Sequence, residues 1–110
     1  MKIHQAFAAS LLLAASIVAR ATTIEMDVNG LVCAFCAQGI EKKLRSFAAT
    51  DDVAVSLEQR LVAVAMKPGQ DIGDEELLKA LTDAGYTVKA IRRADEPIDA
   101  VRKRLEAARR

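Results

Sequence analysis

Residues 22–47 read TTIEMDVNGLVCAFCAQGIEKKLRSF, and the period of the apolar residues changes in the middle of this stretch. Every second residue from Ile24 to Val28 is apolar, which is typical of a half-buried β-strand with a polar second face. Turn residues follow at Asn29 and Gly30. The apolar positions of the second half are Cys33, Cys36, Ile40, Leu44 and Phe47. Because they recur every three or four residues, they predict an amphipathic helix of about three turns.

Residues 53–66 predict a β-hairpin, because two apolar runs are separated by the polar residues 58–60. The inward positions of this hairpin are Val53, Val55, Leu57, Val62, Val64 and Met66. An acidic cluster at residues 71–76 precedes the apolar positions of a second helix, and Gly85 stands where a helix end favours positive φ. Residues 86–91 alternate again and predict the last strand. Its positions on one side are Tyr86, Val88 and Ala90.

The predicted order is therefore strand, helix, strand, strand, helix, strand. This order is typical of an α+β fold of the ferredoxin-like βαββαβ type, in which a four-stranded antiparallel sheet carries both helices on one face. We expect this domain at residues 22–92, followed by a basic, amphipathic helical tail at residues 93–110. The apolar stripe of the tail comprises Ile98, Val101, Leu105 and Ala108. Two interpretations of the tail stay open: a solvated, partly frayed helix, or a basic helix that touches a membrane surface or an acidic partner.

Residues 1–21 have the pattern of a cleaved signal peptide. A weakly basic start precedes an uncharged stretch from Ala6 to Ala19, and small residues stand at Ala19 and Ala21, the positions that a signal peptidase inspects. The uncharged stretch is shorter than the roughly 20 residues that a membrane-spanning helix needs. We therefore expect export to the periplasm.

The chain has 110 residues, of which 52% are hydrophobic and 28% are charged, and this composition is typical of one globular domain. A core of this size leaves little room for a deep catalytic cavity, so we expect a binding protein and not an enzyme. Removal of Lys2 and Arg20 with the leader leaves a mildly acidic mature chain, which argues against binding to nucleic acid. We expect a monomer.

Cys33 and Cys36 are the only cysteines of the chain. They lie just before and within the first turn of the first predicted helix, where backbone amides and the helix dipole favour the thiolate form. Two close thiolates suit a two-coordinate soft ion such as Cu(I) or Hg(II), and we expect no organic cofactor. Met26 and Met66 occupy inward strand positions and are expected in the core, not at the metal.

From the residues alone, three interpretations of the cysteine pair stay open. The pair could bind a metal ion, exchange electrons as a thiol–disulfide redox couple, or form an inert disulfide. A structural zinc site is not expected, because it needs four ligands and the chain offers two cysteines.

Three segments resemble the heavy-metal-associated domains, and the resemblance extends over about residues 23–91. The segments are Gly30-Leu31-Val32-Cys33-Ala34-Phe35-Cys36, Gly39-Ile40-Glu41-Lys42-Lys43-Leu44 and Asp83-Ala84-Gly85-Tyr86. With an export signal, the chain is most similar to the periplasmic mercury-binding proteins and small copper chaperones of that family. The resemblance implies the βαββαβ fold, a solvent-facing dithiolate at Cys33 and Cys36, and transfer of the ion to a membrane metal transporter or another metal-binding domain.

The sequence departs from the family pattern at two places. Leu31-Val32 replaces the usual Met-Thr before the first cysteine, and Ala34-Phe35 replaces a small, polar pair between the cysteines. Phe35 could fold back onto the domain, or it could form a hydrophobic lip that shields the metal or contacts a partner. Tyr86 matches a position near the metal loop, where it could hydrogen-bond near a sulfur or serve only in packing.

Overall fold

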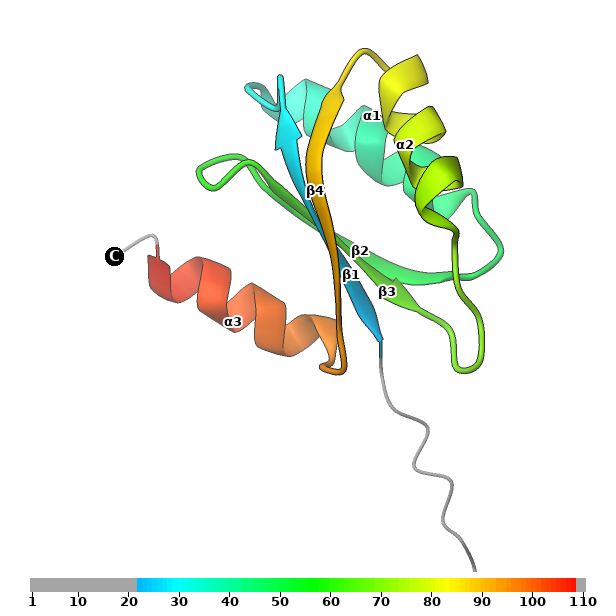
Figure 1. Cartoon of the computed structure of the whole chain (residues 1–110). Helices are drawn as coiled ribbons and strands as arrows, with labels where there is room; N and C mark the ends of the chain where they lie inside the picture. Colours follow the sequence, from blue (N-terminus) through cyan, green and yellow to red (C-terminus); the bar gives the residue numbers. More distant parts are fainter. Residues whose placement is uncertain (1–21, 109–110) are drawn as a thin grey trace, which may run out of the picture.

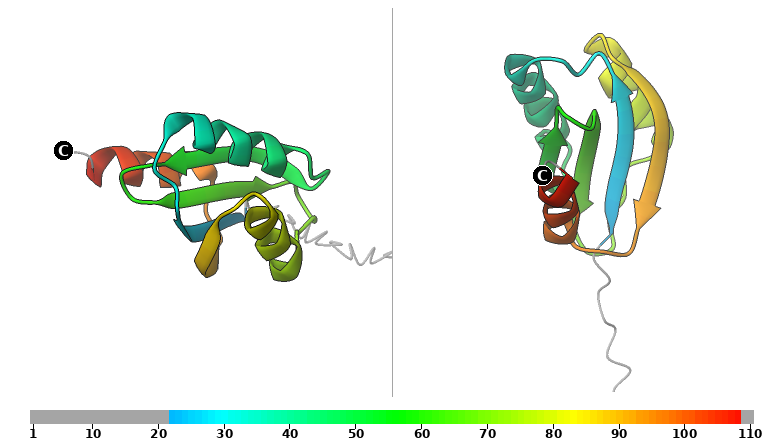
Figure 2. Two further views of the ribbon diagram at one scale, coloured as in Figure 1. Left: turned by 90° about the horizontal axis from the view of Figure 1, so that it is seen from above. Right: turned by 90° about the vertical axis from the view of Figure 1, so that its left-hand side faces the viewer.

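A computed structural model describes residues 22–108 as four strands and three helices (Figure 1). In chain order these are β1 (Thr23–Asn29), α1 (Ala34–Arg45), β2 (Thr50–Ser56), β3 (Leu61–Met66), α2 (Asp74–Asp83), β4 (Thr87–Ala94) and α3 (Ile98–Ala108). The strands form one antiparallel sheet in the order β2-β3-β1-β4. Helices α1 and α2 cover one face, called the inner face here, and α3 lies against the opposite, outer face (Figure 2). The predicted βαββαβ fold with a C-terminal helix is confirmed.

The predicted leader, residues 1–21, lies outside the described residues, so its role as a signal peptide stays a prediction. Within residues 22–108, no helix combines the length and the apolar character that crossing a membrane requires.

The main core fills the space between the inner face of the sheet and the two helices α1 and α2. The alternation of β1 places Ile24, Met26 and Val28 in this core, where none is more than 1% exposed. Helix α1 contributes Ile40 and Leu44 from the periodic face that the sequence predicts. Both methionines that the sequence assigns to inward positions are buried here.

The sequence places Tyr86, Val88 and Ala90 on one side of the last strand, and this prediction is wrong for Ala90. Tyr86, Val88 and Ile91 pack against the main core, whereas Ala90 pairs with Asp27 on the outer side. The cause is a β-bulge: the register shifts between Asp27 and Val28, so Lys89 is an extra residue in β4. Because successive side chains alternate between faces, one extra residue moves all later side chains to the opposite face.

The C-terminal helix packs against the sheet, so the interpretation as a solvated, frayed tail is wrong. Ile98 and Val101 of α3 are buried in a second apolar cluster. The strand residues of this cluster are Leu61, Ala63 and Ala65 of β3, with Ala54 of β2 packed against it. The small alanine side chains let the helix approach the sheet closely. Ile98 and Val101 of the apolar stripe are therefore used inside the molecule, whereas Leu105 is half-buried and Ala108 is exposed.

This packing also changes the polar face of β1. Thr23 and Glu25 lie on the polar second face that the sequence predicts for this half-buried strand, but both are buried beside the C-terminal segment. The Thr23 hydroxyl donates a hydrogen bond of 2.7 Å to the carbonyl oxygen of Glu96. The carboxylate of Glu25 pairs with Arg104 at 3.3 Å. Their polar groups are thus satisfied by partners that lie some 70 residues away in sequence, at separations of 73 and 79.

Candidate metal-binding site

The loop that carries the cysteines is anchored to the domain on its N-terminal side. Leu31 is only 1% exposed and belongs to the main core. Gly30 has φ +91°, and a Cβ built at this position would lie 3.4 Å from Cδ1 of Tyr86. The positive φ favours glycine, because other residues adopt it only at a cost, and the Tyr86 ring lies at contact distance from this position. The buried Leu31 and the backbone conformation of Gly30 therefore fix the position of the loop relative to the end of β1.

The cysteines occupy the N-terminus of α1 as the sequence predicts. Cys33 is the N-cap residue with extended backbone angles, and Cys36 lies in the first helical turn. The Cys33 sulfur accepts a hydrogen bond of 3.1 Å from the backbone N–H of Cys36. Such a donor stabilises negative charge on sulfur when the pair is reduced, because helix N-termini favour anions.

The two sulfurs are brought together in the structure and form a disulfide, with a Cα–Cα distance of 5.3 Å. The described part of the chain holds no group of three or more His, Cys, Asp and Glu side chains that could share a metal ion. Met26 and Met66 are buried in the main core. Once reduced, the site therefore offers two sulfur donors, a set that suits a soft ion with low coordination number.

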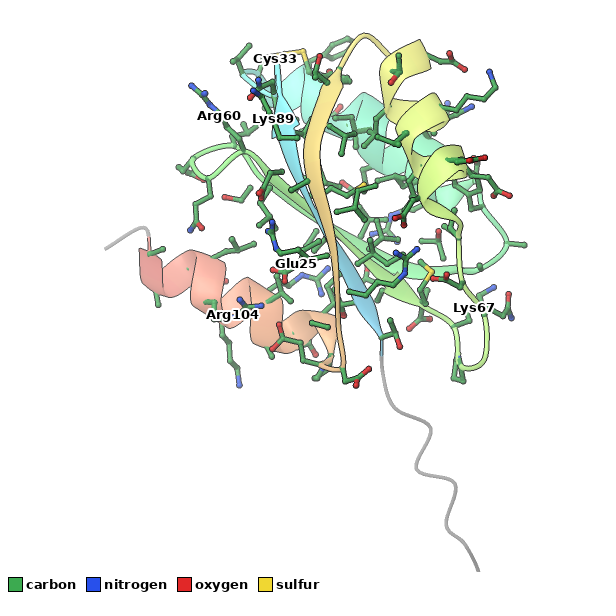
Figure 3. All side chains as sticks on the ribbon, viewed as in Figure 1. Glu25, Cys33, Arg60, Lys67, Lys89 and Arg104 are labelled. Atoms are coloured by element: carbon green, nitrogen blue, oxygen red, sulfur yellow. A yellow bond between two sulfur atoms is a disulfide. The ribbon has the colours of Figure 1, made fainter. Side chains whose placement is uncertain are left out.

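The residues beside the cysteines are exposed and apolar. Val32 is 76% exposed and Phe35 is 84% exposed, so the interpretation in which Phe35 folds back onto the domain is wrong. Val32 points outward because its neighbour Leu31 points inward. Phe35 lies in the first turn of α1 on the side away from the buried Ile40 and Leu44. Figure 3 shows Cys33 at the same end of the molecule as Arg60 and Lys89.

An open, largely apolar groove of about 440 Å³ borders this site between α1 and α2. Its lining residues are Phe35, Cys36, Gly39, Ile40, Lys43, Ala80, Asp83, Ala84 and Tyr86. The contribution of α2 could not be found from sequence, because Ala80 and Ala84 carry no signal beyond an ordinary helix face. Their position beside Cys36 depends on how the two helices pack.

Tyr86 is held next to the loop by the end of α2. The N–H groups of Gly85 and Tyr86 bond to the carbonyl oxygens of Thr82 (3.0 Å) and Leu81 (2.9 Å). This is the Schellman pattern, and it requires the φ of +94° that Gly85 adopts, as predicted. The Tyr86 ring packs against the main core and beside Gly30. Among the described residues its hydroxyl has no hydrogen-bond partner, which supports the packing interpretation.

No protein-family model and no curated protein sequence matches the chain. Solved structures do match it. Oxidized MerP from Ralstonia metallidurans CH34 aligns with TM-score 0.55 and 26% identity over 63% of this chain and 94% of that chain. The N-terminal domain of ZntA in the apo-form aligns with TM-score 0.55 and 28% identity over 67% of this chain and 93% of that chain.

A more distant neighbour shows the same fold. The yeast copper transporter domain CCC2A aligns with TM-score 0.59 and 19% identity over 68% of this chain and 99% of that chain. In each case the alignment spans nearly the whole neighbour and leaves about a third of this chain unmatched. The chain therefore has the fold of the heavy-metal-associated domains, and in structure it resembles MerP and the copper chaperones.

Proposed function

We propose that this protein is an exported carrier, without catalytic activity, of one soft metal ion, Cu(I) or Hg(II). It holds the ion between the sulfurs of Cys33 and Cys36 and passes it to a membrane metal transporter or another metal-binding domain. The observation that carries the proposal is the joined pair of sulfurs at a helix N-terminus, with a backbone N–H donating to one of them. Its support from other proteins comes from neighbours named as a copper transporter domain, a metallochaperone and MerP.

The exposure of the site suits transfer of the ion. A site with two donors at the surface leaves space around the metal, so a thiolate of a partner can approach the ion before it is released. Val32 and Phe35 flank the cysteines and provide an apolar contact surface for that partner. A deeply enclosed site with four ligands would hold the ion permanently.

The oxidation state controls loading. A disulfide offers no thiolate, and soft-metal binding requires thiolates, so the oxidised form must be reduced before it can take up the ion. Protons compete with the metal for the same sulfurs, so affinity should fall as the pH is lowered.

The decisive experiment titrates the reduced mature protein with Cu(I) and with Hg(II) in the presence of a competing thiol. We expect one ion per chain, with a first shell of two sulfurs in X-ray absorption spectra. Cys33→Ser and Cys36→Ser should each lower the affinity by orders of magnitude, on the order of at least a hundredfold, because one of two donors is lost. Ala34→Ser is the matched control, since it adds a hydroxyl between the two cysteines, at the first residue of α1, and removes no sulfur. A first shell dominated by nitrogen or oxygen would contradict the proposal.

Thiol–disulfide exchange is the second candidate, and a disulfide between two half-buried cysteines at a helix start favours it. The two functions differ in a direct assay. Rapid reaction of the oxidised protein with substrate dithiols, together with absence of metal binding by the reduced protein, would select the redox function. Export is tested separately by N-terminal sequencing of the protein from the periplasm, where the mature chain should begin near Thr22.

A further inference from the structure

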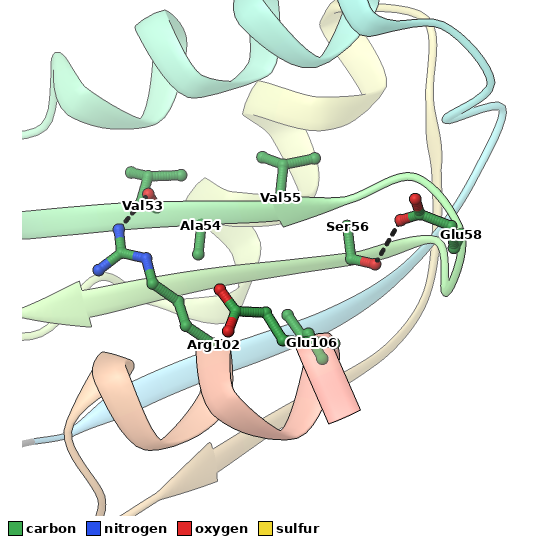
Figure 4. A pocket seen from close by; sticks show the side chains of 8 residues that line it. Val53, Ala54, Val55, Ser56, Glu58, Arg102 and Glu106 are labelled. Atoms are coloured by element: carbon green, nitrogen blue, oxygen red, sulfur yellow. Dashed lines mark hydrogen bonds between the residues drawn. The ribbon is translucent and has the colours of Figure 1, made fainter. Parts of the chain in front are cut away.

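The edge strand β2 carries an arrangement of charges that neither the metal site nor the main core requires. In the order β2-β3-β1-β4, β2 pairs only with β3, so one side of its backbone faces away from the sheet. Residues of an antiparallel strand alternate between facing the paired strand and facing away from it. The backbone N–H of Val53 bonds to Oδ1 of Asp52 at 2.8 Å, and its carbonyl oxygen accepts a bond of 3.2 Å from Nη2 of Arg102. The backbone N–H and carbonyl oxygen of Val53 therefore face the open edge, and side chains satisfy both groups. Figure 4 shows the bond from Arg102 to the carbonyl oxygen.

The two side chains that cover Val53 are themselves tied together across the edge. Asp52 pairs with Arg102 of α3 at 2.9 Å and with Arg45 of α1 at 2.9 Å. Helix α1 lies on the inner face of the sheet and α3 on the outer face, so the network brackets the edge from both sides (Figure 2). Arg45 is held in turn by Glu41, and Arg102 by Asp99.

The backbone is irregular at the same place. The register with β3 shifts between Thr50 and Asp52, so Asp51 has no partner across the ladder. A bulge interrupts the regular row of donors and acceptors that a second strand would need. The bulge, the ion pairs and the covering helix thus meet at one position on the strand.

The edge beyond this position is open. Two residues further on, the backbone N–H and carbonyl oxygen of Val55 face the same open edge, because the direction of these groups alternates along the strand. Here the space between α3 and β2 forms an open cavity of about 250 Å³, lined among others by Val55, Leu105 and Glu106 (Figure 4). A valine-containing edge with free backbone groups is a template for strand pairing.

We propose that Arg102 and Asp52 form a guard that prevents β2 from pairing with the β2 strand of a second copy of this chain. The second copy is the fitting occupant because two identical edges can pair antiparallel about a two-fold axis, so each supplies the donors and acceptors that the other needs. An approaching strand has to displace the charge-assisted bond of Arg102 to Val53 and its ion pair to Asp52. The basic tail thereby acquires a role in keeping an exported carrier monomeric, independent of the metal.

The test compares the oxidised mature protein with its variants, so that free thiols and metal cannot link two chains. Arg102→Met keeps the aliphatic stem over the sheet and removes every donor, and Asp52→Ala removes the other partner. We expect each variant to self-associate about tenfold or more tightly than the parent protein in sedimentation velocity experiments, since one charge-assisted bond no longer opposes pairing. The dimer should also slow hydrogen exchange of the Val55 amide.

Two controls make the result specific. Arg102→Lys, which keeps the charge and a donor, should stay as monomeric as the parent protein. Arg104→Met removes an arginine of the same helix that pairs with Glu25 and Glu96, far from the edge, and should also stay monomeric. The proposal is overturned if Arg102→Met and Asp52→Ala both remain as monomeric as the parent protein over the same concentration range. It is equally overturned if their dimers leave exchange at Val55 unchanged.

Discussion

Val101→Ala tests whether α3 belongs to the folded domain. The side chain of Val101 is 0% exposed and lies in the outer cluster with Leu61, Ala63 and Ala65. The substitution removes two buried methyl groups, whose transfer from water contributes about 0.8 kcal/mol each. The surrounding alanines are too small to fill the space, so a cavity term adds to this loss. We expect the free energy of unfolding to fall by about 2–3 kcal/mol.

The measurement is urea unfolding of the oxidised mature protein, followed by far-UV circular dichroism. With an m-value of about 1–3 kcal/mol/M, the midpoint should fall by roughly 0.7–3 M. In a thermal scan the midpoint should fall by about 8–24 °C, since 1 kcal/mol corresponds to about 4–8 °C for a domain of this size. Leu105→Ala is the matched control on the same helix face. Because Leu105 is only partly buried against the cluster, its loss should be clearly smaller.

The transition should also stay single, because α3 and the sheet share one buried cluster. An unchanged midpoint for Val101→Ala would refute the packing of α3 against β3. A separate early transition that melts the helix alone would refute its cooperation with the domain.

Three further predictions concern the main core, the exposed ring of Phe35 and the ion pair of Asp27. Leu44→Ala should lower the free energy of unfolding by about 2–5 kcal/mol in denaturant unfolding, because the fully buried side chain leaves a cavity. The metal affinity of the folded protein, measured by titration, should change little. Phe35→Ala should change the stability by less than about 0.5 kcal/mol in the same unfolding assay, since the ring is exposed, and a loss of several kcal/mol would mean that the ring packs onto the domain. The hydrogen bond from Arg92 holds the pKa of Asp27 below its ordinary value. Their pair therefore stabilises the fold above about pH 4, which is near the pKa of an unfolded carboxyl group. This contribution disappears as the pH falls through the lower pKa of the folded state. Asp27→Asn should flatten that part of a plot of unfolding midpoint against pH, and an unchanged slope would show that other carboxylates account for it.

Local chemistry along the chain was enough to predict much of this molecule. The change from period two to a helical period after Gly30 marks the junction of β1 and α1, and it places both cysteines at the helix start. The glycine at position 85 predicts the end of α2, because the Schellman bonds need a positive φ there. These features depend on residues close in sequence, so a pattern of a few positions contains the information.

The tertiary structure decided the features that depend on partners far away in sequence. The apolar stripe of the tail is visible in the sequence, but the stripe does not say whether it faces solvent, a membrane or the sheet. The alanines of β3 supply the surface that buries Ile98 and Val101. The bulge at Lys89 arises from the register with β1, and it reverses the faces of the rest of β4. In each case the deciding term is burial against a surface that forms only when distant segments meet.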